Sequence, residues 1–258
     1  MEFDNHINQY WERRRIAESS LYMFQNYLNY GIYGGTVNRF EPNSIQITML
    51  HHFQNTHTQN TDSTRILAHR QSGTTTAMVA YAVWETFFVK THQVNVFVCY
   101  NESMARDIRS KILDLLDCAK SELAKVGINT AEIRQDGHGG FKCTKDLNTL
   151  RVISIGSIQS ATRGLNISSA YFDNIMAASN YHAGEISSTK DFLRKLGTKI
   201  YELQTGLYIG IVSEIEENTS SIRLPIYVDI NFSIERENDL INRIGANRFS
   251  TDYLLMRN

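Results

Sequence analysis

The chain has 258 residues, of which 42% are hydrophobic, and its 26 lysines and arginines nearly balance its 27 aspartates and glutamates. This size allows one large core. The formal net charge of -1 argues against a protein that coats nucleic acid through a uniformly basic surface, although it allows a local basic face. No stretch is long and apolar enough for a membrane-spanning helix, and the first residues lack the pattern of a signal peptide. The three cysteines are therefore expected to be reduced.

The N-terminal part has a helical pattern. Apolar residues recur at helical spacing between Leu21 and Ile32, which predicts a helix over residues 10–33. Two glycines follow and end this pattern. We therefore expect an N-terminal helical extension at residues 1–40 and a single larger domain at residues 41–258.

A second helix is predicted from Ile45 to Phe53, after a turn that contains a proline, with Ser44 as its N-cap. Gln46 lies in the first turn of this helix. A side-chain amide offers a donor and an acceptor in one plane, so a glutamine at this place can read the edge of an adenine. The alternative is an ordinary surface glutamine.

The segment from Ile66 to Trp84 predicts an apolar strand, a polar turn and an apolar helix. This is the layout of a phosphate-binding loop, in which backbone N–H groups and a helix N-terminus face the phosphates. The consensus has a glycine, four further residues, and then glycine, lysine and a hydroxyl residue. Gly73 and Thr75 fit this consensus, but Thr74 occupies the lysine position. The alternative is a threonine-rich N-cap that only satisfies the first amides of the helix.

Strands and helices alternate along the rest of the chain. We predict strands at residues 94–100, 150–155, 170–172, 207–213 and 224–228, and helices at residues 101–125, 186–205 and 239–255. In the helix at 186–205, Phe192, Leu193 and Leu196 are expected to face the core. This alternation favours a three-layer α/β domain around a mainly parallel sheet.

The strand at residues 170–172 is followed by Asp173 and Asn174. In a chain with a phosphate-binding loop, a carboxylate at the carboxyl end of a strand is where the magnesium-positioning acid lies. A glutamate beside it would orient or deprotonate the attacking water. Asn174 stands at that position, and an amide can hold a water but cannot take its proton at neutral pH. The alternative for Asp173 is a turn residue after an edge strand.

These features together resemble the ATPase (motor) domain of the large terminase subunit of tailed phages, over roughly residues 40–255. The matching motifs follow one another in the order that the family has. They are Gln46–Leu50 as the upstream glutamine motif, Arg70–Thr76 as the phosphate-binding loop, Thr162–Gly164 as the Arg-Gly element, Tyr171–Asn174 as the Walker B strand, Val212–Ile215 at the place of the coupling motif, and Arg248–Tyr253 as the stretch that closes the motor domain.

The resemblance implies a three-layer P-loop NTPase of the RecA/ASCE type, with ATP and Mg²⁺ as cofactors. By the same resemblance, Thr75 and Asp173 hold the Mg²⁺, while Asp173, Asn174 and Arg70 occupy catalytic positions. The residues implied in nucleotide binding are Gln46, Arg70, Gln71, Ser72, Gly73, Thr74, Thr75 and Thr76.

Three positions that carry the family's chemistry differ in this chain. Thr74 replaces the lysine, which removes a charge-assisted phosphate contact worth roughly 1.5–3 kcal/mol. Asn174 replaces the glutamate, which removes a base worth about 10²–10⁴ in rate. The coupling motif also lacks its usual threonine-rich sequence. We therefore expect a terminase-like protein of phage DNA packaging or virion assembly that is catalytically inactive.

The alternative is an active, ATP-driven DNA-packaging motor subunit with a non-standard phosphate-binding loop. It requires a replacement cation, for which Arg70 and Arg163 are candidates. It also requires a group that acts on the water, for which Glu185 and Glu214 are candidates. A third hypothesis, a helicase-like or recombinase-like ATPase relic, is less favoured because of the Arg-Gly element.

The resemblance also implies partners and a location. The partners are a portal, a small terminase subunit or a separate active motor chain, with double-stranded DNA and an oligomeric state as further options. The expected location is the host cytoplasm or the virion, without secretion or membrane contact. No nuclease activity is expected, since the chain ends where the family's nuclease domain would begin.

Overall fold

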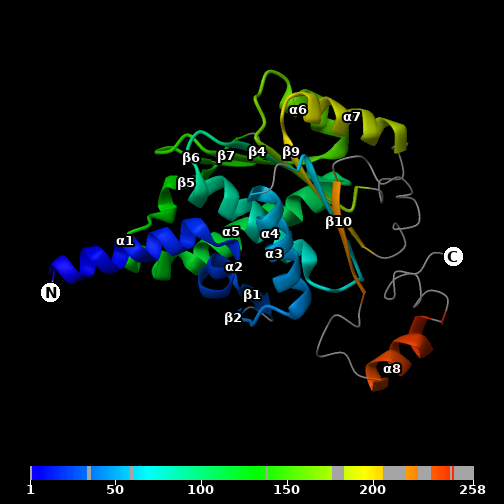
Figure 1. Cartoon of the computed structure of the whole chain (residues 1–258), viewed down its shortest axis with the longest axis horizontal. Coiled ribbons are helices and arrows are strands. Elements are labelled where there is room, and N and C mark those ends of the chain that lie inside the picture. Colours follow the sequence, from blue (N-terminus) through cyan, green and yellow to red (C-terminus); the bar gives the residue numbers. More distant parts are fainter. Residues whose placement is uncertain are drawn as a thin grey trace.

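Parallel strands dominate the central sheet of the computed structural model, which describes residues 2–33, 36–58, 61–137, 139–175, 183–205, 219–225, 234–244 and 246. Within these residues the eight-stranded sheet has the order β10-β3-β9-β8-β4-β7-β6-β5 (Figure 1). All pairings from β10 to β7 are parallel, and β6 and β5 continue the sheet in antiparallel orientation. The strands are β3 (Ser63–Ala68), β4 (Val94–Cys99), β5 (Ile133–Gln135), β6 (Gly140–Cys143), β7 (Thr149–Ser154), β8 (Ser169–Asp173), β9 (Lys199–Thr205) and β10 (Thr219–Leu224).

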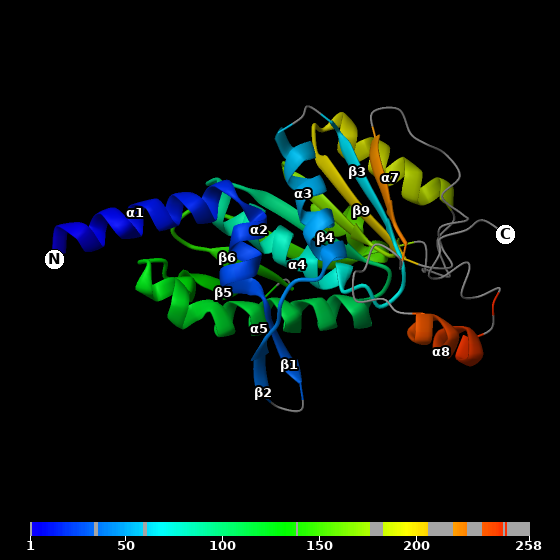
Figure 2. The ribbon, with the colours of Figure 1, turned by 60° about the horizontal axis from the view of Figure 1, so that its bottom comes forward.

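Helices cover both faces of this sheet, which confirms the predicted three-layer α/β architecture (Figures 1 and 2). Successive side chains of a strand point to opposite faces, so each inner strand supplies both cores. Tyr171 and Tyr201 belong to the core under the first group of helices, while Phe172 and Ile200 belong to the core under the second. The first group is α3 (Ser44–Thr58), α4 (Thr74–Trp84) and α5 (Glu102–Lys125), and the second is α6 (Ile158–Thr162) and α7 (Ala183–Lys195).

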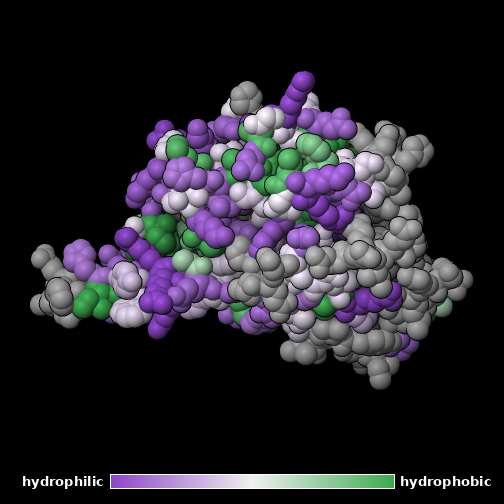
Figure 3. Space-filling view, turned by 45° about the horizontal axis from the view of Figure 1, so that its top comes forward, coloured by the Kyte–Doolittle hydropathy of each residue, from purple (hydrophilic) through white to green (hydrophobic). Residues whose placement is uncertain are grey.

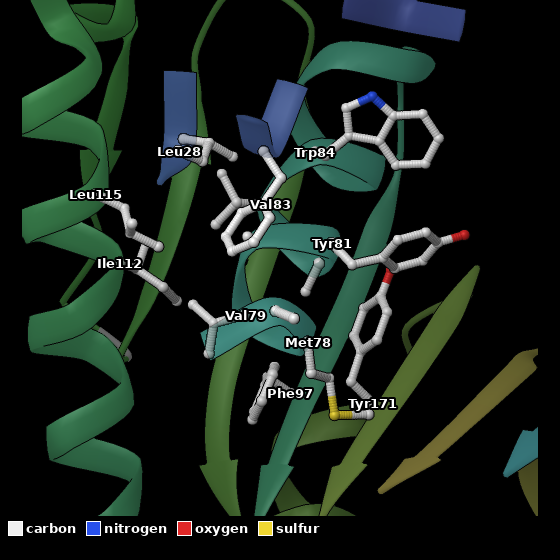
Figure 4. Close-up of a cluster of buried hydrophobic side chains, with 14 of the residues drawn as sticks. Leu28, Met78, Val79, Tyr81, Val83, Trp84, Phe97, Ile112, Leu115 and Tyr171 are labelled. Carbon is white, nitrogen blue, oxygen red and sulfur yellow. The ribbon is translucent and has the colours of Figure 1, made fainter. Parts of the chain in front are cut away.

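Helix α4 is buried almost all round, because it lies between the sheet and the other helices. Its sequence is apolar on every side, and such a helix is stable only when it is enclosed. Figure 4 shows Val79 near Ile112 of α5, and Met78 near Phe97 and Tyr171 of the sheet. The burial of α4 therefore fixes the orientation of its first turn, which directly follows the loop.

The N-terminal segment is only partly helical. Its elements are α1 (Glu2–Glu18), α2 (Ser20–Met23), the π-helical turn η1 (Phe24–Leu28), and the antiparallel strands β1 (Tyr30–Tyr33) and β2 (Thr36–Arg39). The predicted helix over residues 10–33 is interrupted at Ser19, whose hydroxyl accepts a hydrogen bond from the Tyr22 amide and starts a new helix. The prediction is wrong from Tyr30 onward, since glycine disfavours a helix while tyrosine and isoleucine suit a strand.

The N-terminal segment shares its core with the rest of the chain. Met23, Phe24 and Leu28 are buried in the same cluster as α4, and the indole N–H of Trp84 donates to the carbonyl of Ile16 at 2.7 Å. The first turns of α1 extend away from the sheet (Figure 2). Residues 1–40 therefore contribute to the packing that holds α4.

The predicted helix at 186–205 is two elements. Helix α7 ends at Lys195, and the chain reverses at Gly197, which has a φ of 76°. The amide of Thr198 donates to the carbonyl of Leu193 at 3.1 Å, which closes the helix end. Residues 199–205 then form β9, because their backbone pairs with β3 on one side and β8 on the other rather than continuing the helix.

The orientation of α7 also differs from the prediction. Leu193 is buried, but Phe192 and Leu196 are 57% and 46% exposed. Figure 3 shows an apolar area among polar side chains on the side of the molecule that carries α6 and α7. The three apolar residues were expected on one inward face. Neighbouring residues of a helix point in different directions, so Leu193 faces the sheet while Phe192 does not, and Leu196 follows the last residue of α7.

The remaining predictions differ mainly in their boundaries. The predicted strands at 94–100, 150–155 and 170–172 correspond to β4, β7 and β8, and the helix at 101–125 corresponds to α5. Strand β10 lies at 219–224, and of the strand predicted at 224–228 only residues 224 and 225 are described. Helix α8 (Ile234–Ile244) overlaps the helix predicted at 239–255, of which residues 245 and 247–255 lie outside the described residues. The strand predicted at 207–213 and the motifs at 212–215 and 248–253 lie outside the described residues. The short turns are η2 (Glu85–Val89), η3 (Thr130–Glu132) and η4 (Ile155–Ser157).

A buried ionic cluster connects α7 to the sheet. The carboxylate of Glu202 on β9 lies 3.0 Å from Arg65 of β3 and 2.9 Å from Lys190 of α7. Burial acts to raise the pKa of Glu202, but the charges of Lys190 and Arg65 outweigh it and hold that pKa at about 2. Removing one member would leave an uncompensated buried charge, so the cluster fixes α7 over β9 and β3.

We predict that Gly197→Ala destabilises the fold by about 1–2 kcal/mol, because alanine is strained in the left-handed conformation. Gly137 is the matched control, since a side chain would also meet open space there and its φ is not positive. Urea denaturation of Gly197→Ala and Gly137→Ala measures the difference. Equal midpoints for the two variants would contradict the role of Gly197 as the end of α7.

Candidate nucleotide-binding site

The predicted phosphate-binding loop connects β3 to α4 at the carboxyl edge of the sheet. β3 ends at Ala68 and α4 begins at Thr74. Between them, Gln71 and Gly73 have φ angles of 61° and 73°, so the chain turns sharply before the helix starts. The first turn of α4 therefore lies directly after the loop. At this end, a helix offers unpaired N–H groups to an anion.

Helix α3 holds this loop through two side-chain amides. Asn43 Nδ2 donates to the carbonyl of Ser72, and Gln46 Nε2 donates to the carbonyl of Gly73, each at 3.0 Å. A Cβ atom at Gly73 would lie only 2.7 Å from Gln46 Nε2. Only glycine thus fits at this position while Gln46 keeps its contact.

Asn43 and Gln46 also form a reciprocal cap at the start of α3. The amide of Gln46 donates to Asn43 Oδ1 at 2.8 Å, and the amide of Asn43 donates to Gln46 Oε1 at 3.1 Å. Asn43 is therefore the N-cap, and the expectation that Ser44 has this role is wrong. Gln46 is buried and uses its amide on the loop and the cap. Adenine reading by Gln46 stays a prediction.

The side chain at the lysine position of the loop lies inside the protein. Thr74 is buried, and its Oγ1 is 3.0 Å from the hydroxyl of Ser72, which is also buried. Arg70 and Gln71 are exposed on the loop, and Thr75 and Thr76 are half-buried on the first turn of α4. Thr74 thus offers no cation to a phosphate, whereas Arg70 is a cation on the surface of the loop.

The end of β8 brings Asp173 to this loop. Thr75 Oγ1 donates to Asp173 Oδ1 at 3.4 Å, although 98 residues separate them. In the sheet, β9 lies between β3 and β8, so the contact spans two strand positions. The parallel strands make this possible, because their carboxyl ends lie at one edge.

Asp173 is fully buried, and one of its oxygens is left without a partner. Burial raises the pKa of Asp173 from 3.8 to about 7, against the hydrogen bond from Thr75, the charge of Lys111 and the hydrogen bond from Asn174. Both hydrogen bonds go to Oδ1, and Oδ2 has no hydrogen-bond partner among the described residues. A buried orphan carboxylate oxygen is costly, which makes it a candidate ligand.

Asn174 directs its side chain to its neighbours. Its Nδ2 donates to Asp173 Oδ1 at 2.7 Å. Its Oδ1 accepts from the amide of Thr205 at 2.9 Å and from the hydroxyl of Thr205 at 2.8 Å. Both ends of the Asn174 amide are thus engaged at the carboxyl ends of β8 and β9.

The other residues proposed from the sequence either do not contact the loop or lie outside the described residues. Arg163 is exposed where α6 ends, and the structure shows no contact between it and the loop. The side chain of Glu185 and the whole of Glu214 lie outside the described residues. Sequence reasoning missed Asn43 and Thr205. The spacing of Asn43 and Gln46 is the signature of a reciprocal cap, but Thr205 carried no signal while its segment was predicted as a helix.

The residues at the loop fit a magnesium ion that is shared with phosphates. Mg²⁺ prefers oxygen ligands and is usually held by one or two protein side chains plus substrate phosphates. The Thr75 hydroxyl and the unpaired Asp173 Oδ2 are oxygens of this kind. In the part of the chain that is described, no group of three or more histidine, cysteine, aspartate or glutamate side chains could hold a metal ion without such phosphates.

Comparison with known proteins gives matches among solved structures only. No protein-family model matches the sequence, and no curated protein matches it. The large terminase of bacteriophage HK97 aligns with a TM-score of 0.59 at 9% identity, over 89% of this chain and 47% of that chain. A large terminase of a thermophilic bacteriophage, in complex with ADP, aligns with a TM-score of 0.57 at 11% identity, over 83% of this chain and 53% of that chain.

An isolated domain matches along nearly its whole length. A variant of the large terminase ATPase domain of Thermus phage P74-26 aligns with a TM-score of 0.56 at 14% identity, over 85% of this chain and 95% of that domain. By contrast, the chain spans about half the length of the HK97 protein and of the ADP-bound protein. The predicted fold, that of the terminase ATPase domain, is confirmed.

Among the helices described, none is long and apolar enough to cross a membrane.

We predict that Asp173→Asn stabilises the metal-free protein at pH 8 and has little effect near pH 4. The raised pKa means that the folded state keeps a proton which the unfolded chain loses between about pH 4 and 7. The cost of ionising Asp173 is therefore absent below pH 4 and complete above pH 7, where it is on the order of 4 kcal/mol. Denaturation of both proteins at the two pH values measures it.

The control for this prediction is Asp107→Asn, which removes an exposed carboxylate from α5. Its effect on stability should be small and equal at both pH values. A stabilisation by Asp173→Asn that does not grow with pH would contradict the burial of the Asp173 carboxylate.

Proposed function

We propose that the protein is a terminase-like module of phage DNA packaging or virion assembly that binds a nucleotide with Mg²⁺ and does not hydrolyse it. The observation that carries this proposal is the contact of Thr75 with Asp173. It places a hydroxyl and a buried carboxylate beside a loop of phosphate-binding shape. The fold, shared with large terminase ATPase domains, supports the same setting.

Nucleotide binding rests on parts of the site that need no lysine. The loop is fixed by Asn43 and Gln46, so its N–H groups require little reorganisation before they meet a phosphate. When bound, Mg²⁺ would neutralise phosphate charge, with Thr75 and Asp173 as its protein ligands. One structural neighbour is in complex with ADP, and another with ATP-γ-S.

The absence of hydrolysis rests on two side chains. Thr74 is buried against Ser72, so the transferred phosphate loses the cation that usually stabilises it. Asn174 has no basic atom, and its amide is already engaged with Asp173 and Thr205. Positions 74 and 174 therefore supply neither the charge nor the base, while the binding elements of the loop remain.

The alternative proposal is an active packaging motor subunit. One observation favours it: Arg70 is exposed on the loop itself, where an arginine could replace the lysine. This function also requires a base for the water, and Asp173, the carboxylate that contacts Thr75, stands at the proposed magnesium-binding position instead. For either function, the partners that we propose are a portal, a small terminase subunit or a separate motor chain, with double-stranded DNA.

We predict that ADP binds more tightly with Mg²⁺ than without it, by about tenfold, and that Thr75→Ala removes this gain. A charge-assisted contact of the bound cation is worth roughly 1.5–3 kcal/mol. Calorimetry with ADP, with and without Mg²⁺, measures both quantities. Thr48→Ala is the control, because Thr48 is an exposed threonine of α3. No ADP binding at millimolar concentration would refute the proposed binding function.

We predict that the protein shows no Mg²⁺-dependent ATP turnover above the level of its Thr75→Ala variant. The missing base alone lowers the rate by about 10²–10⁴. Phosphate release from ATP measures this, with Arg70→Ala as a further variant. Turnover in the wild-type protein that is lost in both Arg70→Ala and Thr75→Ala would establish the active motor instead.

A further inference from the structure

The side chain of Asn174 connects the two strands that end beside the loop. It donates to Asp173 Oδ1 and accepts twice from Thr205, and its own backbone amide donates to the carbonyl of Leu203 at 2.9 Å. We call this set of four hydrogen bonds the Asn174 bridge. It joins the carboxyl end of β8 to the carboxyl end of β9, which neighbours the strand of the phosphate-binding loop.

The backbone at Asn174 suits an asparagine. Its φ of 51° lies in the left-handed region, which asparagine adopts more readily than most residues with a side chain. Glutamate has no such preference, and its longer side chain would carry the polar group past Thr205. The conformation of this turn therefore agrees with the residue that the chain has.

The bridge also decides which oxygen of Asp173 is available. Asn174 and Thr75 both donate to Oδ1, which leaves Oδ2 buried and without a partner among the described residues. A carboxylate whose one oxygen is held by two donors cannot rotate freely. Its other oxygen then has a fixed position for a cation, as preorganised sites require.

We propose that Asn174 is a positioning residue, which fixes the Asp173 carboxylate and ties β9 to β8, and that only an amide can do both. The part that concerns Asp173 rests on the proposed binding of Mg²⁺ and nucleotide. A carboxylate at this place can accept from Thr205 but cannot donate to Asp173. Asn174, at the position of the family's glutamate, thus has a different role in this chain.

The test uses two variants that separate the two ends of the amide. Asn174→Asp has nearly the same shape and keeps the acceptor for Thr205, but it loses the donor to Asp173. Asn174→Ala loses both. Asn129→Ala is the control, because Asn129 is an exposed asparagine that caps η3 with a similar side-chain hydrogen bond.

The first measurement is hydrogen exchange at the Thr205 amide in the metal-free, full-length protein. We expect Asn174→Ala to exchange about tenfold faster than the wild type, because a hydrogen bond is lost, and Asn174→Asp to stay close to the wild type. Unchanged exchange in Asn174→Ala would overturn the link to β9. This measurement needs no nucleotide, so it decides that link even if the proposed function fails.

The second measurement is the gain in ADP affinity that Mg²⁺ produces, by calorimetry. We expect both variants of Asn174 to lose the gain of the wild type, about tenfold, while Asn129→Ala keeps it. A purely structural asparagine would leave this gain intact in Asn174→Asp, and that result would overturn the positioning of Asp173. If Mg²⁺ does not change the ADP affinity of the wild-type protein, the proposed function and the positioning of Asp173 for a cation both fail. The link to β9 is then decided by the hydrogen-exchange result alone.

Discussion

The burial of α4 is the constraint on which the candidate site depends. Because this helix is apolar on every side, it must lie between the sheet and the other helices. Its first turn therefore lies at the edge of the sheet where the parallel strands have their carboxyl ends. The N-terminal segment contributes to that enclosure through residues such as Phe24 and Leu28. The loop before α4 is then fixed from outside by Asn43 and Gln46. The position of Thr75 beside Asp173 follows from these packing relations.

The buried carboxylate at the edge of the sheet costs stability that packing elsewhere must offset. Asp173 could form a stable turn without being buried, and the fold as such needs no carboxylate at this place. Groups that are kept in an unfavourable environment are more often functional than structural, although ion-pair networks also perturb pKa values. Glu202 is an example of the second kind, since two cations surround it. Among the described residues, Asp173 contacts hydrogen-bond donors and forms no ion pair, although the charge of Lys111 also acts on it, and this leaves room for a cation.

The sequence predicts the parts of this structure that local patterns determine. The spacing of Gly73 and Thr75 identifies the loop, and the acid after an apolar strand identifies Asp173, because parallel strands bring such residues to one edge. The pattern fails where tertiary contacts decide. Residues 199–205 have apolar spacing that suits a helix, and only pairing with β3 and β8 makes them a strand. The contacts of Thr205 could not be foreseen for that reason, and the burial of Thr74 depends on Ser72 and on the fixed loop.

The buried ionic cluster of Arg65, Lys190 and Glu202 has a consequence for behaviour on heating. Taking charges out of water becomes less costly as temperature rises, while the gain from apolar burial levels off. The attachment of α7 to the sheet therefore weakens less on heating than a purely apolar contact of the same size. On heating, the layer that carries α7 would therefore stay in register with β9 and β3 after more ordinary packing has begun to loosen.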